Sequence, residues 1–199
     1  MADPVSTPEG REFSVAAKLY ICAGRVLPRG GGMFFWTSPT GETVSAKTLA
    51  EGLVITTIDW LNENGWIQIW TAEVKQLFVK VPVLGVRAVH SGGPGFAGRL
   101  LESTGWQDSD VMQMTSNLIA RRSEDPKMAL LAAAAREFQE AGVCLSGVWN
   151  KEWLDYLSAA WHAEAAQWYA HAMAQPWAET ARRNAVAGIG ARLAPRDDD

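Results

Sequence analysis

Few residues in this chain have the types and spacing that chemistry requires. Its histidines, His90, His162 and His171, form no His-Glu-x-x-His motif, and Cys22 and Cys144 form no Cys-x-x-Cys pair. Zinc sites are usually recognised by such pairs. The Gly-x-Ser-x-Gly turn that exposes a nucleophilic serine is also absent. We therefore expect no catalytic residue, no metal and no cofactor, and we interpret both cysteines as small buried apolar residues.

Two glycine-rich stretches, residues 29–32 and 91–95, invite a search for ligand chemistry. Neither ends in the lysine and serine or threonine that a phosphate-binding P-loop requires. Glycine and proline mark turns more often than they mark sites. We interpret both stretches as loops.

The charge balance disfavours nucleic acid as a partner. The 199 residues include 18 basic and 22 acidic ones, which gives a formal net charge of −4. Nucleic-acid-binding surfaces usually show a basic excess or stripe. The unusual feature of the composition is its ten tryptophans, since tryptophan favours cores, protein interfaces and membrane boundaries.

Hydrophobic periodicity and turn residues predict a mainly α-helical fold with a small β-hairpin. The predicted helices cover residues 12–22, 45–64, 96–104, 109–122, 126–141, 151–173 and 176–187, and the predicted strands cover residues 33–36, 66–70 and 76–81. Asp125 and Asn150 are expected to cap the helices that follow them, because short polar side chains accept hydrogen bonds from free N–H groups of a first turn.

Three of the predicted helices share one stop signal. Gly65, Gly105 and Gly142 each follow an apolar residue by four positions and precede another apolar residue. This spacing is typical of the Schellman motif, in which glycine adopts a left-handed conformation and the two apolar residues meet across the turn. We predict positive φ at all three glycines.

The predicted helix 151–173 carries an apolar stripe rich in tryptophan. The stripe consists of Trp153, Leu157, Trp161, Ala165, Trp168 and Ala172. It either packs the helix onto its own domain or forms a partner surface, and we favour packing, with Trp161 and Trp168 almost fully buried. Beside the stripe, Glu164 and His171 stand two turns apart and are interpreted as edge residues. The candidate interaction surface comprises Trp153, Trp161, Trp168, Arg182 and Arg183.

A helix followed by a hairpin, as predicted for residues 45–64 and 66–81, is also the order found in winged-helix proteins. A helix that reads DNA must expose Arg, Lys, Asn or Gln to the base edges. Opposite its main apolar stripe, however, this helix carries Val54, Ile55 and Ile58 with the single base Lys47. We therefore expect it to be buried on nearly all sides.

Three segments resemble the Golgi phosphoprotein family of helical adaptor proteins: residues 13–22, residues 53–69 with their helix ending in glycine before a strand, and residues 132–143 with a second such ending. The resemblance implies a helical adaptor. In that family the lipid-binding members hold a phosphoinositide head group with one tryptophan and several basic residues. The corresponding positions here are Ser45, Val54, Met128 and Leu131, so no lipid-site residue carries over, because a phosphate needs cations or oriented donors.

These observations predict a helical domain over residues 12–149, a helical extension over 150–190 packed on it, and disordered tails over 1–11 and 191–199. With no apolar run long enough to span a membrane and no signal peptide, we expect a cytoplasmic protein. The favoured function is a non-enzymatic adaptor or protein-interaction domain that binds a protein partner or self-associates. The alternatives are a peripheral protein that binds anionic lipid head groups and a winged-helix-type regulator.

Overall fold

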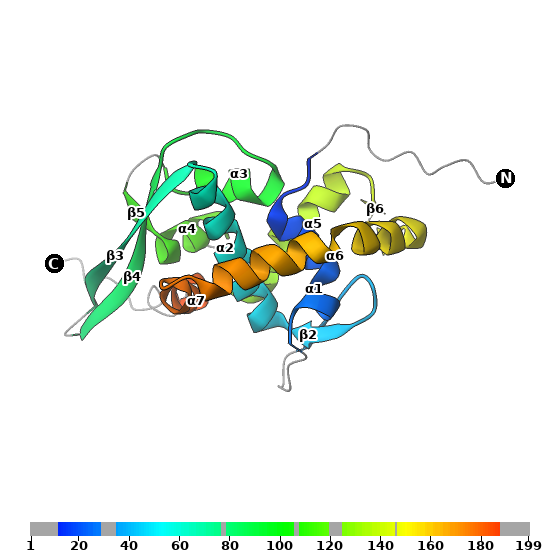
Figure 1. The fold of residues 1–199 in the computed structure, drawn as a ribbon, viewed down its shortest axis with the longest axis horizontal. Helices are drawn as coiled ribbons and strands as arrows, with labels where there is room; N and C mark the ends of the chain where they lie inside the picture. Colours follow the sequence, from blue (N-terminus) through cyan, green and yellow to red (C-terminus); the bar gives the residue numbers. More distant parts are fainter. Residues whose placement is uncertain are drawn as a thin grey trace.

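The structure is a computed structural model and describes residues 12–28, 35–76, 79–105, 108–119, 125–145 and 147–187. The other elements are arranged around one helix buried at the centre of the molecule (Figure 1). The helices of the described part are α1 (Val15–Val26), α2 (Ala46–Glu63), α3 (Gly95–Glu102), α4 (Val111–Leu118), α5 (Pro126–Glu140), α6 (Lys151–Ala174) and α7 (Ala178–Ala187). The strands are β1 (Phe35–Thr37), β2 (Thr43–Ser45), β3 (Ile67–Gln76), β4 (Val79–Ala88), β5 (Ser109–Asp110), β6 (Cys144–Leu145) and β7 (Val148–Trp149). The predicted mainly α fold with a small β part is confirmed. The tails predicted over 1–11 and 191–199 lie outside the described residues.

The central helix is α2. It packs against α1, α5, α6 and α7, and of its eighteen residues only Lys47 and Glu63 are exposed. The Ser45 side chain caps its first turn by accepting the Thr48 N–H at 3.3 Å. The prediction that this helix is buried on nearly all sides is confirmed. It therefore offers no polar face to a DNA groove.

The hairpin is longer than its sequence predicted. Strands β3 and β4 pair antiparallel from Ile67 opposite Ala88 to Gln76 opposite Val79, and β5 joins β4 at Gly85 and Val86. Helix α7 lies against β4, where the Asn184 amide oxygen accepts the Leu84 N–H at 2.9 Å and its NH₂ group donates to the Pro82 carbonyl at 3.3 Å. One buried side chain thus satisfies the backbone of β4 beyond the end of β5.

The shared helix stop is confirmed at all three glycines, whose φ angles are +72° at Gly65, +65° at Gly105 and +72° at Gly142. The bond that closes the Schellman motif runs from the Trp66 N–H to the Leu61 carbonyl at 2.8 Å, and from the Val143 N–H to the Phe138 carbonyl at 2.9 Å. The residue after Gly105 lies outside the described residues. Asp125 and Asn150 cap α5 and α6 as predicted.

A buried carboxylate joins three helices. Glu137 of α5 is 1% exposed and accepts the Ser14 N–H at 3.0 Å, the Ser14 hydroxyl, and the Phe96 N–H. Ser14 is the cap of α1, and Phe96 is the second residue of α3. A carboxylate is favoured at helix N-termini, because first-turn N–H groups lack partners within the helix.

We expect Gly65→Ala to lower the free energy of unfolding by about 1 kcal/mol. A Cβ at this position would meet no atom within 4 Å, so the cost comes from the left-handed backbone alone. Urea denaturation of the variant measures it. Gly65→Asn is the control and should lose less, because asparagine tolerates this conformation better than alanine. Equal losses for the two variants would contradict the backbone explanation.

We expect Glu137→Gln to destabilise the protein by roughly 2–4 kcal/mol, because the amide turns a donor toward N–H and O–H groups that need an acceptor. Glu140→Gln is the matched control on the same helix. Its side chain is 36% exposed and forms ion pairs at the surface, which contribute under about 1 kcal/mol. Urea denaturation of both variants provides the comparison. A loss no larger for Glu137→Gln than for Glu140→Gln would show that the buried carboxylate is dispensable.

Candidate functional site

Helix α6 crosses the front of the molecule in Figure 1 and packs against α1 and α2. Its buried residues are Leu154, Leu157, Ser158, Ala165 and Ala172. Two of these five are alanines, whose small side chains let the helix axis lie close to its neighbours. The space between α6 and its neighbouring helices is therefore narrow, and the larger side chains of α6 lie on its flanks.

The predicted burial of the tryptophans is wrong for this reason. Trp161 and Trp168 are both only partly buried. Trp161 still contacts the core, with its ring 5.1 Å from Phe13 and 6.3 Å from Phe138 between centroids. Trp168 lies edge-on to His171 at 6.0 Å. The stripe continues inward through Ala165 and Ala172, while the indoles stand at its edge.

The remaining candidate residues are also accounted for. Trp153 is partly buried and meets the exposed ring of Tyr156 edge-on at 6.1 Å. The Arg182 guanidinium binds the buried Glu51 carboxylate, with its Nε and Nη2 atoms at 3.2 and 3.1 Å from Oε2. Arg183 pairs with Glu179 at 3.0 Å. The structure thus brings the two arginines to carboxylates of the protein itself, and it does not bring them together with the tryptophans.

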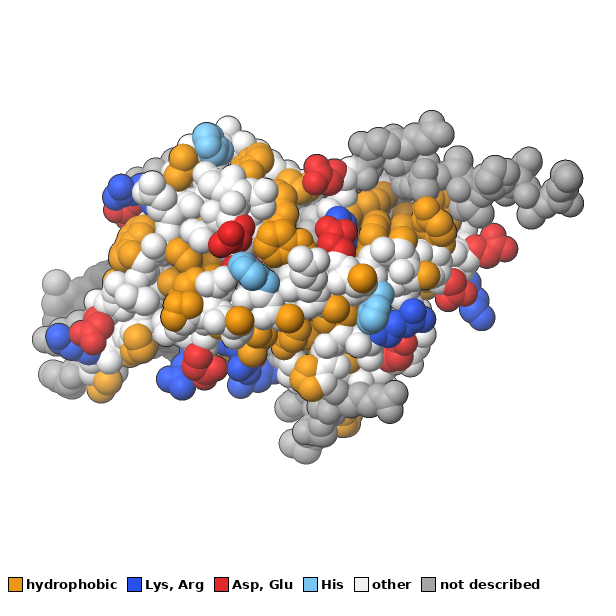
Figure 2. Space-filling view, viewed as in Figure 1, with side chains coloured by type: hydrophobic (Ala, Val, Ile, Leu, Met, Phe, Trp, Pro, Cys, Tyr) orange, Lys and Arg blue, Asp and Glu red, His pale blue; other side chains and the backbone are white. Residues whose placement is uncertain are grey.

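The solvent side of α6 is unusual for a surface helix. This side, here called the outer face, consists of Tyr156, Ala159, Ala160, Ala163, Ala166, Gln167, Ala170, Met173 and Ala174. All but the half-buried Ala166 are exposed, including 57% of Tyr156 and 37% of Met173. Between Tyr156 and Trp177 the only formal charge, with histidines counted as neutral, is Glu164, which binds Lys18 of α1 at 2.6 Å. In Figure 2 hydrophobic side chains follow this helix across the front, with charged ones set to its sides.

On the flank of α6, His171 contacts a buried carboxylate of α2. Its Nδ1 atom lies 2.6 Å from Oδ2 of Asp59, which is fully buried, whereas 46% of the histidine side chain is exposed. The other oxygen of Asp59, Oδ1, is buried without a hydrogen-bond partner in the described part of the chain. Because Nδ1 faces the carboxylate, the exchangeable proton of the imidazole is the one on Nε2.

Electrostatics at this pair follow from its burial. Removal from water raises the pKa of Asp59, although the hydrogen bond from His171 opposes that rise. The hydrogen bond to Asp59 raises the pKa of His171. No serine, cysteine or lysine has a hydrogen bond to this imidazole among the contacts of the described residues, so the pair can bind and release a proton but has no nucleophile to activate.

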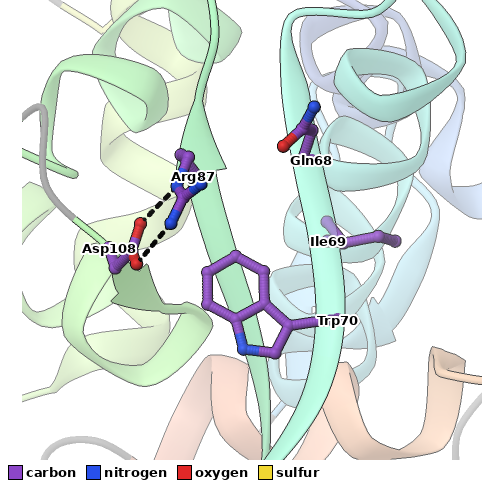
Figure 3. Close-up of a pocket in the computed structure, with 5 residues that line it drawn as sticks. All are labelled: Gln68, Ile69, Trp70, Arg87 and Asp108. Atoms are coloured by element: carbon purple, nitrogen blue, oxygen red, sulfur yellow. Dashed lines mark hydrogen bonds and ion pairs between the residues drawn. The ribbon is translucent and has the colours of Figure 1, made fainter.

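A second surface feature is an open hollow on the three-stranded sheet (Figure 3). The Trp70 ring covers Gly85 of the neighbouring strand, where a Cβ would come within 2.3 Å of the indole. Arg87 lies 6.0 Å from that ring and binds Asp108 through two hydrogen bonds of 2.6 and 2.7 Å. The guanidinium holds the pKa of Asp108 below its usual range. Since its cation is already paired, the hollow has no open charge for an anionic ligand.

The stretch 91–95 was predicted as a loop; residues 91–94 form one, and Gly95 already begins α3. The sequence here also contains a glycine pattern that the loop interpretation missed. Gly93, Gly95 and Gly98 have the G-x-G-x-x-G spacing of dinucleotide-binding loops. Gly93 lies between β4 and α3, whereas Gly95 and Gly98 belong to the first turn of α3. The structure shows a different use of these glycines. A Cβ on Gly98 would come within 2.4 Å of the Gly93 carbonyl oxygen, and a Cβ on Gly95 would collide with the Glu137 carboxylate. The N-terminus of α3 is therefore occupied by the protein's own anion.

No family model matches the chain, and no curated protein or solved structure matches it either. The resemblance to Golgi phosphoproteins therefore stays a prediction. Within the described ranges, no helix is both long and apolar enough to cross a membrane, and no group of three or more His, Cys, Asp or Glu residues is placed to hold a metal ion. Cys22 and Cys144 are both buried and free, as predicted.

We expect Trp161→Ala to cost about 2–4 kcal/mol of stability, somewhat less than a fully buried aromatic residue, because its ring packs on Phe13 and Phe138. Trp168→Ala should cost less than about 1 kcal/mol, as surface substitutions do. Chemical denaturation of the two variants measures this difference. Equal costs would mean that Trp168 contributes as much packing as Trp161 does through the aromatic cluster.

Proposed function

We propose that the protein is a non-enzymatic protein-interaction domain of the adaptor kind, which binds a helix of a protein partner along the outer face of α6. The observation that carries the proposal is the absence of charge from this face. A 24-residue helix is about 36 Å long, and a surface helix normally presents charged side chains opposite its buried stripe. Here that side presents alanines between Tyr156 and Met173.

The small side chains favour a helical partner. Axes of packed helices lie 8–10 Å apart depending on the contacting side chains, and alanine permits the closest approach. A complementary partner helix would carry apolar residues at steps of three and four, as other helices that bind in grooves do. Tyr156 and Met173 are large enough to serve as contacts at the two ends of such an interface, since aromatic residues and methionine are enriched in interfaces.

The charges around α6 favour a protein over a lipid surface. Anionic head groups attract clustered free cations, whereas Lys18, Arg182 and Arg183 are paired with Glu164, Glu51 and Glu179. The N-terminal end of α6 carries the acidic Glu152 and Asp155. These pairings support protein binding and leave little net positive charge near the outer face.

Photo-crosslinking in cells tests the proposal. A benzophenone amino acid at Ala163 should give discrete protein adducts, and Ala170→Glu in the same chain should reduce their yield at least tenfold by placing a charge in the interface. Two controls accompany it. The crosslinker at Lys80, whose side chain is 76% exposed on the hairpin, should not give these adducts. Ala132→Glu, at an exposed alanine of α5, should leave the yield from Ala163 unchanged.

Two outcomes would contradict the proposal. Adducts from Ala163 that Ala170→Glu does not reduce would show that the outer face is not the binding surface. The second outcome is that the purified protein co-sediments with anionic vesicles, and that Ala170→Glu abolishes this binding while Ala132→Glu does not. This result would assign the face to a membrane instead.

A further inference from the structure

We propose that Asp59 and His171 form a proton-dependent contact that holds the C-terminal half of α6 on α2, so that docking of this helix weakens as the pH rises above neutrality. The contact is a property of the fold and does not depend on the proposed partner. Three observations carry it: the 2.6 Å separation of Nδ1 and Oδ2, the complete burial of Asp59, and the exposure of the imidazole on its other side.

Burial makes the charged form of the Asp59 carboxylate costly. A charged group out of water needs a partner of opposite charge or a full set of hydrogen bonds. Oδ1 of Asp59 has neither among the described residues, so the imidazolium of His171 is the principal compensation. When the imidazolium loses its Nε2 proton to solvent, the neutral ring keeps the Nδ1–H bond to Oδ2. The attraction between opposite charges is lost, and a buried negative charge remains.

Neighbouring charges do not supply a substitute. Glu63, one turn along α2, is negative and favours the protonated form of both groups. Lys18 of α1 is bound to Glu164 of α6, and Arg182 of α7 is bound to Glu51 of α2. From α5, Glu137 is turned toward Ser14 and Phe96, and from α3, Arg99 donates to the Ala133 carbonyl.

The sign of the pH dependence is the same for both groups. The pKa of His171 is raised from 6.5, so its contribution to stability is complete below about pH 6.5 and is lost as the pH rises through the folded-state value. The pKa of Asp59 is also raised from its usual 3.8, so its protonated form too is favoured by folding. The folded state therefore holds more protons than the unfolded state, and stability falls as the pH increases.

Equilibrium unfolding of the full chain between pH 5 and pH 9 tests the proposal. One linked proton makes the unfolding constant rise by up to tenfold per pH unit above pH 6.5. His171→Gln, which keeps a donor toward Asp59 but cannot bind a proton, should remove this component of the slope. His162→Gln, at an exposed histidine of the same helix, should retain it. The same slope in wild type and His171→Gln would overturn the proposal.

A titration by NMR of the wild-type protein covers the case in which the variant does not fold. The imidazole signal of His171 should titrate above pH 6.5, and amides of residues 165–174 should lose protection from hydrogen exchange over the same pH interval. Titration at or below 6.5, or protection that is constant across the interval, would also overturn the proposal. Asp59→Asn should lower the midpoint of the His171 titration, and an unchanged midpoint would show that Asp59 is not the partner that matters.

Discussion

A carboxylate inside a protein must be supplied with hydrogen-bond donors, and Glu137 takes its donors from the N-terminal ends of two other helices. This interaction fixes α1 and α3 against α5. With α1 in place, the Phe13 ring stacks on Phe138 at 5.2 Å, and Trp161 of α6 closes over both rings. The position of α6, and so of its outer face, depends on where Glu137 holds the start of α1. The same carboxylate also occupies the N-terminus of α3, which is the position where a loop with this glycine spacing would hold a phosphate.

Helix α6 is attached to the molecule by two charged contacts set seven residues apart. Glu164 reaches Lys18 of α1, and His171 reaches Asp59 of α2. Residues separated by seven positions lie nearly on one line along a helix, so both contacts fall on the same flank. Between and beyond them, Ala165 and Ala172 pack inward. Beyond Tyr156, the only acidic residue of the helix thus contacts a neighbouring helix, and this is why the outer face is left without charge.

The parts of the fold that the sequence predicted are those that local chemistry determines. Gly65 and Gly142 end helices because no other residue adopts the left-handed conformation as easily, and Asp125 and Asn150 begin helices because their side chains accept first-turn N–H groups. The hairpin was predicted too short, because the polar residues Glu73 and Lys75 interrupt the apolar pattern that would have identified its outer half as strand.

The polar contacts of the candidate site were not predictable from spacing. Asp59 and His171 are 112 positions apart, and Ser14 and Glu137 are 123 apart. The burial of Trp161 and Trp168 was misjudged for a related reason: periodicity locates a stripe, but the distance to the neighbouring helices decides which of its residues fit.

The exposed aromatic residues of the sheet and of α6 differ in what they leave for a partner. On the sheet, one face of the Trp70 ring packs over Gly85. The nearby Arg87 is paired with Asp108, so this region already has partners for its ring face and its cation within the chain. On α6, Tyr156 is 57% exposed, and the alanines beyond it offer only methyl groups to solvent. Each exposed methyl costs little in water, at about 25 cal/mol per Å², so the free protein can tolerate this face. The same methyl groups let a second helix approach along several turns, where burial accumulates over the whole length. Exposure of this face to water costs little free energy. A large apolar area is buried only when a long, closely fitting partner binds, so the face favours a helix over a small ligand.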